Sequence, residues 1–288
     1  MESSRCKAFL AAVDYGSFSK AADKLNYTPS GVSQLVSALE NELGLTLLER
    51  NNKGVHPSAD GQLLIPAMRE FIAQEERMYQ TTAEILGLSV GRVSIASYVS
   101  VATHWLPQVI SKFQKDYPGI QLSLMDGIRQ EVNSWLDSKQ ADIAFTSFKE
   151  PMGYDWIPLA EDPMIAVLPK NHPLASESIF PVERIAEEKL IMPGLGHDDD
   201  VFPMFDKFGI TPNIAYATIE TFSALQMVEQ GLGISIMNEL ITRNWQCDVV
   251  KLPIFPAQSI TLGIAVPSLQ HASPAVRKFI KYAQDVIQ

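Results

Sequence analysis

The segment between residues 18 and 35 constrains the fold more than any other part of this chain, because its apolar residues have the spacing of two short helices that meet at a tight turn. The apolar side chains recur at intervals of three and four residues, which places them on one face of each helix. Asn26 stands where the turn requires a residue that tolerates a left-handed backbone. Thr28 can cap the second helix, and Pro29 suits its first position, where no intrahelical hydrogen bond is lost. The spacing predicts a helix-turn-helix, with an ordinary αα-hairpin as the alternative.

The residues on either side of this segment extend the motif. Upstream, an apolar stripe between Cys6 and Val13 predicts a preceding helix, which ends at Gly16. Downstream, residues 43–57 predict a short two-stranded wing with a polar turn at Asn51 to Gly54. A helix in front of the motif and a wing behind it favour a winged helix-turn-helix over a plain hairpin.

These segments resemble the N-terminal domain of LysR-type transcriptional regulators. The resemblance rests on the run AFLAAVDYGSFSKAADKLNYTPSGVSQLVSALENELGLTLLER and on the PSADG that follows. Four later segments also resemble the family: LPQVISKFQKDYPGIQLSL, QADIAFTS, GITPNIAYATIE and VEQGLGISIM. The resemblance implies a sequence-specific DNA-binding regulator of transcription that is controlled by a small-molecule effector. It also implies a homodimer, assembled further into a dimer of dimers, that binds double-stranded promoter DNA and contacts RNA polymerase.

A single long helix is predicted from Ser58 to about Leu86. Its apolar stripe has few interruptions, and the positions between are polar or charged. A stripe of that length outside a globular core is expected to pair with a second copy of itself. The resemblance implies the same role, that of a linker that dimerises two winged domains. The alternative is a helix that folds onto its own C-terminal domain.

From residue 91 onward, strand and helix patterns alternate, beginning with a strand and then a helix from Val101 to Tyr117. This alternation indicates an α/β sheet with mostly parallel strands. The pattern restarts near residue 163, and its last strand and helix return to the first half. The predicted fold is a winged helix-turn-helix and a linker helix, followed by a two-lobed α/β effector domain like that of periplasmic binding proteins. The predicted boundaries are 1–57 for the DNA-binding domain, 58–90 for the linker and hinge, and 91–288 for the effector domain, with 91–162 and 266–288 in lobe I and 163–265 in lobe II.

The net charge of −10 is unevenly distributed along the 288 residues. Residues 1–57 carry six basic and six acidic side chains, whereas residues 91–288 carry 15 basic and 22 acidic ones. The acidity therefore belongs mainly to the C-terminal part, and the N-terminal domain is neutral rather than basic. The expectation that this domain binds DNA rests on its motif and not on its charge.

The second helix of the motif is expected to enter the major groove, with its N-terminal residues toward the base edges. Gln34 could pair with adenine through two hydrogen bonds, and Arg50 and Lys53 in the wing are placed for contacts with the backbone or the minor groove. Many LysR-type regulators carry a basic residue at the positions matching Gln34 and Ser37; this chain does not, which predicts weak salt dependence. The alternative is a helix face that is merely solvated. The predicted DNA-contacting residues are Thr28, Ser30, Ser33, Gln34, Ser37, Arg50 and Lys53.

Ligands of two-lobed α/β folds bind at the carboxyl ends of strands, against helix N-termini. Hydroxyl groups and helix N–H groups at these ends favour a carboxylate or another anion, with aromatic side chains as apolar walls. In the family, the position matching Ser100 is a recurrent effector contact, so the resemblance implies that role here; the alternative is a helix cap. The predicted effector-binding residues are Ser97, Tyr98, Ser100, Thr146, Ser147, Phe148, His197 and Thr218.

The run His197-Asp198-Asp199-Asp200 is an unusual local concentration of charge. Neighbouring carboxylates on one loop do not converge on a metal without partners elsewhere, so no metal is expected. The aspartates are instead predicted to cap and charge-stabilise a helix that begins at Val201. An acidic loop at the cleft mouth would disfavour dianions. This leaves a monocarboxylate, an amino-acid-like molecule or a neutral molecule as the effector, with no cofactor.

Several other classes of protein are disfavoured by the sequence. No nucleophile, base and acid are grouped in a way that would support an enzyme. The first residues do not resemble a signal peptide, and no run approaches the roughly 20 apolar residues of a membrane span. The two cysteines are far apart, which suits a reducing compartment. A cytoplasmic protein without membrane contact is expected, and the alternative from another class is a cytoplasmic solute-binding protein without a direct promoter role.

Overall fold

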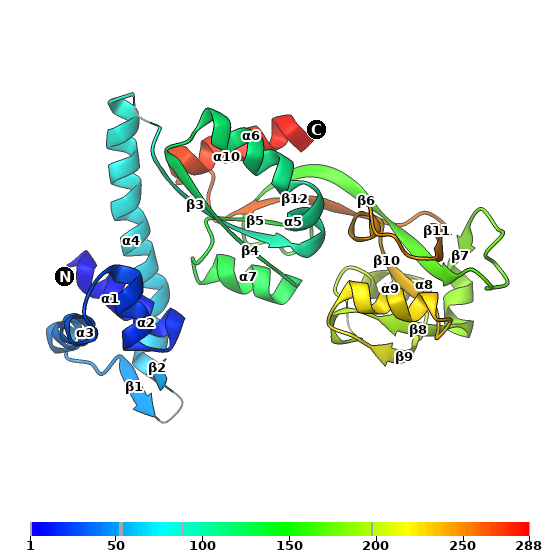
Figure 1. Ribbon diagram of the computed structural model, residues 1–288, viewed down its shortest axis with the longest axis horizontal. Helices are drawn as coiled ribbons and strands as arrows, with labels where there is room; N and C mark the ends of the chain where they lie inside the picture. The colour runs from blue at the N-terminus through cyan, green and yellow to red at the C-terminus, as the bar shows by residue number, and fades with distance from the viewer. Residues whose placement is uncertain (1, 52–53, 88, 197, 288) are drawn as a thin grey trace.

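The computed structural model describes residues 2–51, 54–87, 89–196 and 198–287. Figure 1 shows a small N-terminal domain, a long helix that rises from it, and two lobes beyond the helix. The two lobes lie side by side, and the first lobe stands between the N-terminal part and the second lobe. The chain is therefore extended, with its N-terminal domain and its second lobe at opposite ends.

The N-terminal domain is the winged helix-turn-helix that the apolar spacing predicts. At the turn, Asn26 has a φ of 56°, the left-handed conformation expected of it. The Thr28 hydroxyl oxygen accepts a hydrogen bond from the Gly31 amide at 3.1 Å, and Pro29 is the first helical residue. The elements are α1 (Ser3–Tyr15), α2 (Phe18–Leu25), α3 (Pro29–Leu43) and the wing strands β1 (Leu48–Asn51) and β2 (Gly54–Pro57).

Helix α4 (Ala59–Ile85) is the predicted linker helix, capped by the Ser58 hydroxyl, which accepts from the Gly61 amide at 3.0 Å. At Gly61 the helix passes very close to the chain that enters the wing. A Cβ added there would lie 2.2 Å from the carbonyl oxygen of Leu47, so any larger residue would push the backbones apart. The start of α4 is therefore packed directly on the DNA-binding domain.

Further along, α4 contacts lobe I on one side and exposes apolar residues elsewhere. Glu84 pairs with Lys278 at 2.7 Å, and Glu70 pairs with Lys139. Gln80 is buried, with an exposed fraction of 6%. The helix thus touches its own effector domain, as the alternative interpretation held, while a stripe of large apolar side chains stays exposed. The most exposed of these are Leu63, Met78, Tyr79, Ile85 and Leu86.

Lobe I is built on β3, which pairs in parallel with β4 on one side and with β5 on the other. The single helix predicted from Val101 to Tyr117 is wrong: two helices meet at Trp105, and Pro107 in the first turn of the second removes a backbone donor. The elements of lobe I are β3 (Gly91–Tyr98), α5 (Val99–His104), α6 (Leu106–Asp116), β4 (Ile120–Gly127), α7 (Arg129–Asp137), β5 (Ile143–Ser147), β12 (Ser259–Val266) and α10 (Pro274–Ile287).

Lobe II follows the long strand β6 and contains a small parallel pair, β8 with β9, besides the strands that pair with β6. The strand and helix pattern predicted to restart near residue 163 is present, and α9 packs its buried residues Ala224, Leu225 and Val228 in this lobe. The elements are β6 (Asp155–Pro169), β7 (Phe180–Pro181), η1 (Val182–Glu187), β8 (Lys189–Met192), η2 (Gly194–Gly196), α8 (Phe202–Phe208), β9 (Asn213–Ala217), α9 (Thr221–Glu229), β10 (Ser235–Asn238), η3 (Leu240–Thr242) and β11 (Val249–Phe255).

Strand β6 joins the lobes, because its first half pairs with β12 and its second half with β10 and β11. All these pairings are antiparallel, and the strand order is β4-β3-β5-β12-β6-β11-β7. The expectation of mostly parallel strands is therefore wrong, and the sheet is mixed. The reason is that β6 and β12 run between the lobes in opposite directions and pair with each other directly.

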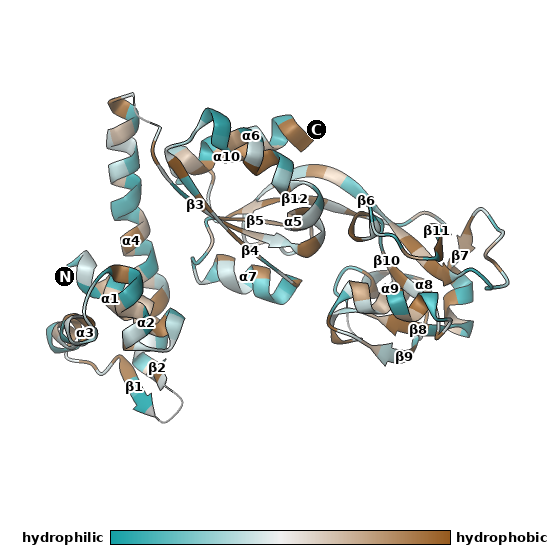
Figure 2. Cartoon of the chain, viewed as in Figure 1, coloured by the Kyte–Doolittle hydropathy of each residue, from teal (hydrophilic) through white to brown (hydrophobic). Residues whose placement is uncertain are grey.

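Each part of the molecule has its own apolar core. In Figure 2 the brown, hydrophobic residues gather on the strands of the two lobes, and the hydrophilic ones lie largely on the helices around them. Phe9 is fully buried in the N-terminal domain, Phe113 and Phe279 in lobe I, and Phe180 in lobe II. In the part of the chain that the structure describes, no helix is long and apolar enough to cross a membrane.

Candidate functional site

Helix α3 presents most of the predicted DNA-contacting residues on one exposed face. The opposite face is buried, because Val32, Val36 and Leu39 pack into the core of the N-terminal domain. The helix is thereby held with its other face toward solvent. The predicted residues exposed there are Thr28, Ser30, Gln34 and Ser37.

Arg50 connects the wing to α3. Its guanidinium Nη2 donates to the Ser33 hydroxyl at 3.0 Å, and the group lies 4.5 Å from the centre of the Phe18 ring. Ser33 is half-buried and Arg50 is exposed, so both lie at the seam between the helix and the wing. The remaining predicted contact, Lys53, lies outside the described residues.

A cavity of about 340 Å³ lies between the two lobes, beside the strands that join them. Lobe I contributes residues that follow β4 and β5, and lobe II contributes α8 and the loop before it. The lining side chains of lobe I are Arg129, Phe148 and Lys149, and those of lobe II are Asp199, Asp200, Pro203, Met204 and Lys207. The connecting segments add Met164, Gln258, Ser259, Ile260 and Thr261.

At this cavity, charged side chains join the two lobes. Arg129, the first residue of α7, donates through Nη2 to the Asp200 carboxylate and to the Ser147 hydroxyl. Ser147, the last residue of β5, donates to the same carboxylate oxygen, Oδ1, at 2.5 Å. The Arg129 and Asp200 side chains are only 10% and 12% exposed. A second, more exposed pair joins Lys149 to Asp199 at 3.2 Å, so the lobes are held together by charge-assisted hydrogen bonds.

Tyr98 completes the network from lobe I. Its ring centre lies 5.6 Å from the Arg129 guanidinium, and its hydroxyl lies 3.4 Å from the Ser147 hydroxyl. Burial, helped by the nearby Asp200 charge, raises the pKa of the Tyr98 phenol well above its ordinary range, so the phenol stays protonated. Burial opposes the charge of Arg129, yet the pKa of Arg129 is raised above its ordinary value, with the charge and the hydrogen bond of the Asp200 carboxylate among the causes, so the guanidinium stays charged.

The predicted hydroxyl residues of β3 and β5 lie beside one another, because the two strands pair in parallel. Ser97 is fully buried and donates to the Tyr98 carbonyl at 2.9 Å. Ser100, in the first turn of α5, is 9% exposed, and Thr146 is 2% exposed. These three side chains are therefore buried and do not line the inter-lobe cavity.

The other predicted effector residues are separated from one another. Phe148 is half-exposed and lines the inter-lobe cavity. Thr218 follows β9, donates to the Glu220 carbonyl at 3.1 Å, and does not line the cavity. His197 lies outside the described residues.

The acidic loop before α8 differs from the predicted helix cap. Within the part of the loop that the structure describes, no side chain caps α8; the Asp198 carboxylate instead accepts a hydrogen bond from the Asp200 amide at 2.8 Å. Asp199 and Asp200 form the ion pairs with lobe I described above. The prediction fails for these two residues because opposite charges on the facing lobe outweigh the weak field of a short helix. Among the described residues, no three His, Cys, Asp or Glu side chains are grouped so as to hold a metal ion.

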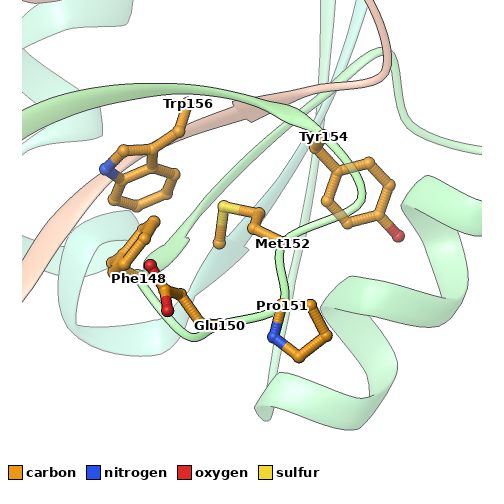
Figure 3. A pocket seen from close by; sticks show the side chains of 6 residues that line it. All are labelled: Phe148, Glu150, Pro151, Met152, Tyr154 and Trp156. Carbon is orange, nitrogen blue, oxygen red and sulfur yellow. The ribbon is translucent and has the colours of Figure 1, made fainter.

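A second hollow, of about 530 Å³, lies on lobe I next to Phe148. In Figure 3, Met152 lies in the middle, with Phe148 and Trp156 to one side of it and Tyr154 to the other. The Phe148 and Trp156 ring centres are 5.6 Å apart. Among the described residues, those that line this hollow all belong to lobe I or to the start of β6, so a molecule bound there would not bridge the lobes.

Sequence reasoning missed Arg129 and Lys149 as site residues and assigned Asp200 a local role. A usable signal was present for Arg129, since it comes two residues after the carboxyl end of β4. The rule that selected the ends of β3 and β5 applies equally to that strand. Nothing local marks Asp200 as the partner, because the two residues are 71 positions apart.

Comparisons with known proteins agree with this architecture. Residues 4–62 match the bacterial regulatory helix-turn-helix proteins of the lysR family, and residues 87–288 match the LysR substrate binding domain. The HTH-type transcriptional regulator YvbU of Bacillus subtilis is 30% identical over 290 residues, covering 99% of each chain.

Two solved structures have the same fold at lower sequence identity. Full-length CbnR in complex with its target DNA has a TM-score of 0.67 at 20% identity, covering 99% of this chain and all of that one. The effector binding domain of QuiR in complex with shikimate has a TM-score of 0.62 at 22% identity, covering 69% of this chain and 97% of that one.

A winged helix-turn-helix on a long helix, followed by two lobes around a ligand-sized cavity, defines a one-component transcriptional regulator. The chain belongs to the LysR family of transcriptional regulators. It is a DNA-binding regulator with an effector-binding domain, and not an enzyme.

Proposed function

We propose that α3 reads base edges in the major groove of a promoter, with Gln34 as the principal specific contact. The proposal rests on the exposure of Gln34 and its neighbours on a helix whose other face is buried. Arg50 would contact the DNA backbone from the wing, close to Ser33. CbnR, which shares the fold, has been solved with its target DNA, and this supports the same use of the domain here.

The effector of this regulator would bind in the inter-lobe cavity. A molecule there touches both lobes and the segments that join them, so its binding energy depends on how the lobes are arranged. Because an effector shifts an equilibrium only by its unequal affinity for two states, a site between movable parts suits regulation. The effector binding domain of QuiR, which has the same fold, was solved with shikimate bound.

Helix α4 would join two copies of the chain through its exposed apolar stripe, in the manner of a coiled coil. Two dimers would then assemble into a tetramer that spans an interrupted operator, in the cytoplasm. The DNA-binding domain would end at residue 57 and the linker and hinge at residue 90, as predicted. The effector domain would divide into its two lobes at the two crossovers, since β6 and β12 carry the chain between the lobes.

The observation that carries this proposal is that one chain joins an exposed recognition helix to a ligand-sized inter-lobe cavity through α4. Fluorescence anisotropy of the full chain on the intergenic DNA upstream of its own gene, with an unrelated duplex as control, tests it. We expect tight binding to the intergenic DNA and much weaker binding to the control. Equal binding to both duplexes would contradict the proposal that α3 reads sequence at this site.

A further inference from the structure

The Arg129 network has the form of an occupied carboxylate site. Two donors held by lobe I, the guanidinium of Arg129 and the hydroxyl of Ser147, converge on one oxygen of Asp200. Ser147 is fully buried and Arg129 is nine-tenths buried, so lobe I presents these donors in a nearly fixed arrangement. The Arg129 Nε is also buried, and among the described residues it finds no hydrogen-bond partner. Lobe I therefore offers more donor capacity than the Asp200 side chain uses.

The cavity beside this network favours an anion that also has an apolar part. Its charged lining comprises three cations, Arg129, Lys149 and Lys207, and two carboxylates, Asp199 and Asp200. Each carboxylate pairs with a cation of lobe I, while the Lys207 ammonium donates to the neutral Gln258 side chain at 2.9 Å. The balance is one positive charge. The apolar part of the wall comes from Phe148, Met164, Pro203, Met204 and Ile260.

We propose that Asp200 is an internal carboxylate ligand of the Arg129–Ser147 site, and that the effector is a carboxylate that replaces it. This inference rests on the proposed function, because it names the chemical class of the effector and the contact that opposes its binding. Without effector, Asp200 ties lobe II to lobe I through Arg129 and Ser147. The effector carboxylate takes the same donors, its apolar part enters the adjacent cavity, and the Asp200 loop is released. Asp200 thereby sets the effector concentration at which the regulator responds.

Competition by an internal ligand makes a quantitative prediction. The apparent dissociation constant of an external carboxylate equals the intrinsic constant divided by the fraction of molecules in which Asp200 has left the site. Substituting Asp200→Asn keeps the shape of the side chain but removes the charge that competes for Arg129. Benzoate is a suitable probe, because it joins a carboxylate to an apolar ring, and benzamide is its neutral counterpart.

The test is isothermal titration of the full chain, without DNA, with benzoate, acetate and benzamide. We expect Asp200→Asn to bind benzoate at least tenfold more tightly than the parent does, and to show no such gain for benzamide. Asp206→Asn is the matched control: it removes one negative charge from an exposed position of α8 that does not line the cavity, and should leave the benzoate affinity within twofold of the parent. Arg129→Gln should abolish benzoate binding. If that variant does not fold, as judged by circular dichroism, the Asp200→Asn comparison decides alone.

Equal affinity of the parent and Asp200→Asn for benzoate and acetate would overturn the inference, and so would a failure of both proteins to bind either carboxylate. A gain for benzamide as large as that for benzoate would also do so, since it would mean that the charge is not what competes. The proposed function is tested separately by DNA binding. A parent protein that ignores its operator would contradict that function, while the benzoate comparison would still decide the role of Asp200.

Discussion

At the scale of single residues, Asp142 shows how burial changes the chemistry of one carboxyl group. Asp142 directly precedes β5, and its carboxylate accepts a hydrogen bond at 2.7 Å from the amide of Ser94, which lies in β3. Burial raises the pKa of Asp142 to about 6, and the nearby Glu76 charge adds to the effect. Because the folded-state pKa lies above the ordinary value of 3.8, the ionised group destabilises the folded state at neutral pH.

Asp142→Asn should therefore stabilise the protein at pH 7.5 and lose this advantage as the pH falls from about 6 toward 4. Asparagine retains an oxygen that can accept from Ser94, and it removes the buried charge. The expected gain is about 1–3 kcal/mol at neutral pH, seen as a higher thermal midpoint. Melting curves of variant and parent at pH 7.5 and pH 5 measure it. A difference between the two proteins that does not change with pH would contradict this account.

Gln34 is the residue whose side chain is expected to carry base discrimination. Gln34→Ala should weaken binding to the operator by about 1–3 kcal/mol, which is roughly 5- to 150-fold, because a bidentate contact with adenine is lost. Binding to an unrelated duplex should not change, since the side chain contributes no charge to the backbone contacts. Anisotropy on both duplexes measures the two affinities.

Gln121→Ala provides the matched control for this experiment, because Gln121 is exposed on β4 in the effector domain, away from α3. It should bind the operator as the parent does. Unchanged operator affinity in Gln34→Ala would remove Gln34 from the recognition surface.

At the scale of elements, α4 meets different partners on different faces. Glu75 pairs with Lys7 of α1 at 2.8 Å, whereas Glu84, nine residues later and therefore on the opposite face, pairs with Lys278 of lobe I at 2.7 Å. The exposed apolar side has no partner within the described chain that would account for residues such as Tyr79 and Ile85, which are 64% and 80% exposed. An apolar stripe of this kind on a long helix is expected to be covered by another helix.

Tyr79→Glu should weaken self-association by roughly tenfold or more, because it places a charge where apolar side chains of two helices would meet. Gln62→Glu, at an exposed position on a different side of α4, adds the same charge and should leave association unchanged. Sedimentation velocity over a range of protein concentrations distinguishes the two variants. Equal association of both variants and the parent would show that α4 does not form the interface at Tyr79.

At the scale of the whole molecule, the net charge is −10, and the N-terminal domain that would contact DNA is neutral. The protein therefore offers the DNA phosphates little positive charge. Affinity that depends on few phosphate contacts falls only gently as salt rises. Ser37→Lys adds one cation to the exposed face of α3. It should strengthen binding to any duplex and make the slope of log affinity against log salt steeper by about 0.9.

Anisotropy titrations between 50 and 200 mM salt, within the range over which counterion release is marked, measure that slope. Ser123→Lys, on β4 in the effector domain, adds the same charge far along the chain and should leave the slope unchanged. The same slope for Ser37→Lys and the parent would place position 37 away from the phosphates.

The sequence by itself determined the features that arise from neighbouring residues. The two helices of the motif, the left-handed Asn26, the Thr28 cap and the full length of α4 follow from spacings of three or four residues and from local capping, and all are present in the structure. The tertiary structure alone decided which distant segments meet. The antiparallel pairing of β6 with β12 and the Arg129–Asp200 ion pair join residues that are far apart in sequence. No local periodicity encodes such pairings, because their energies depend on burial and on opposite charges that come together only when the lobes fold against each other.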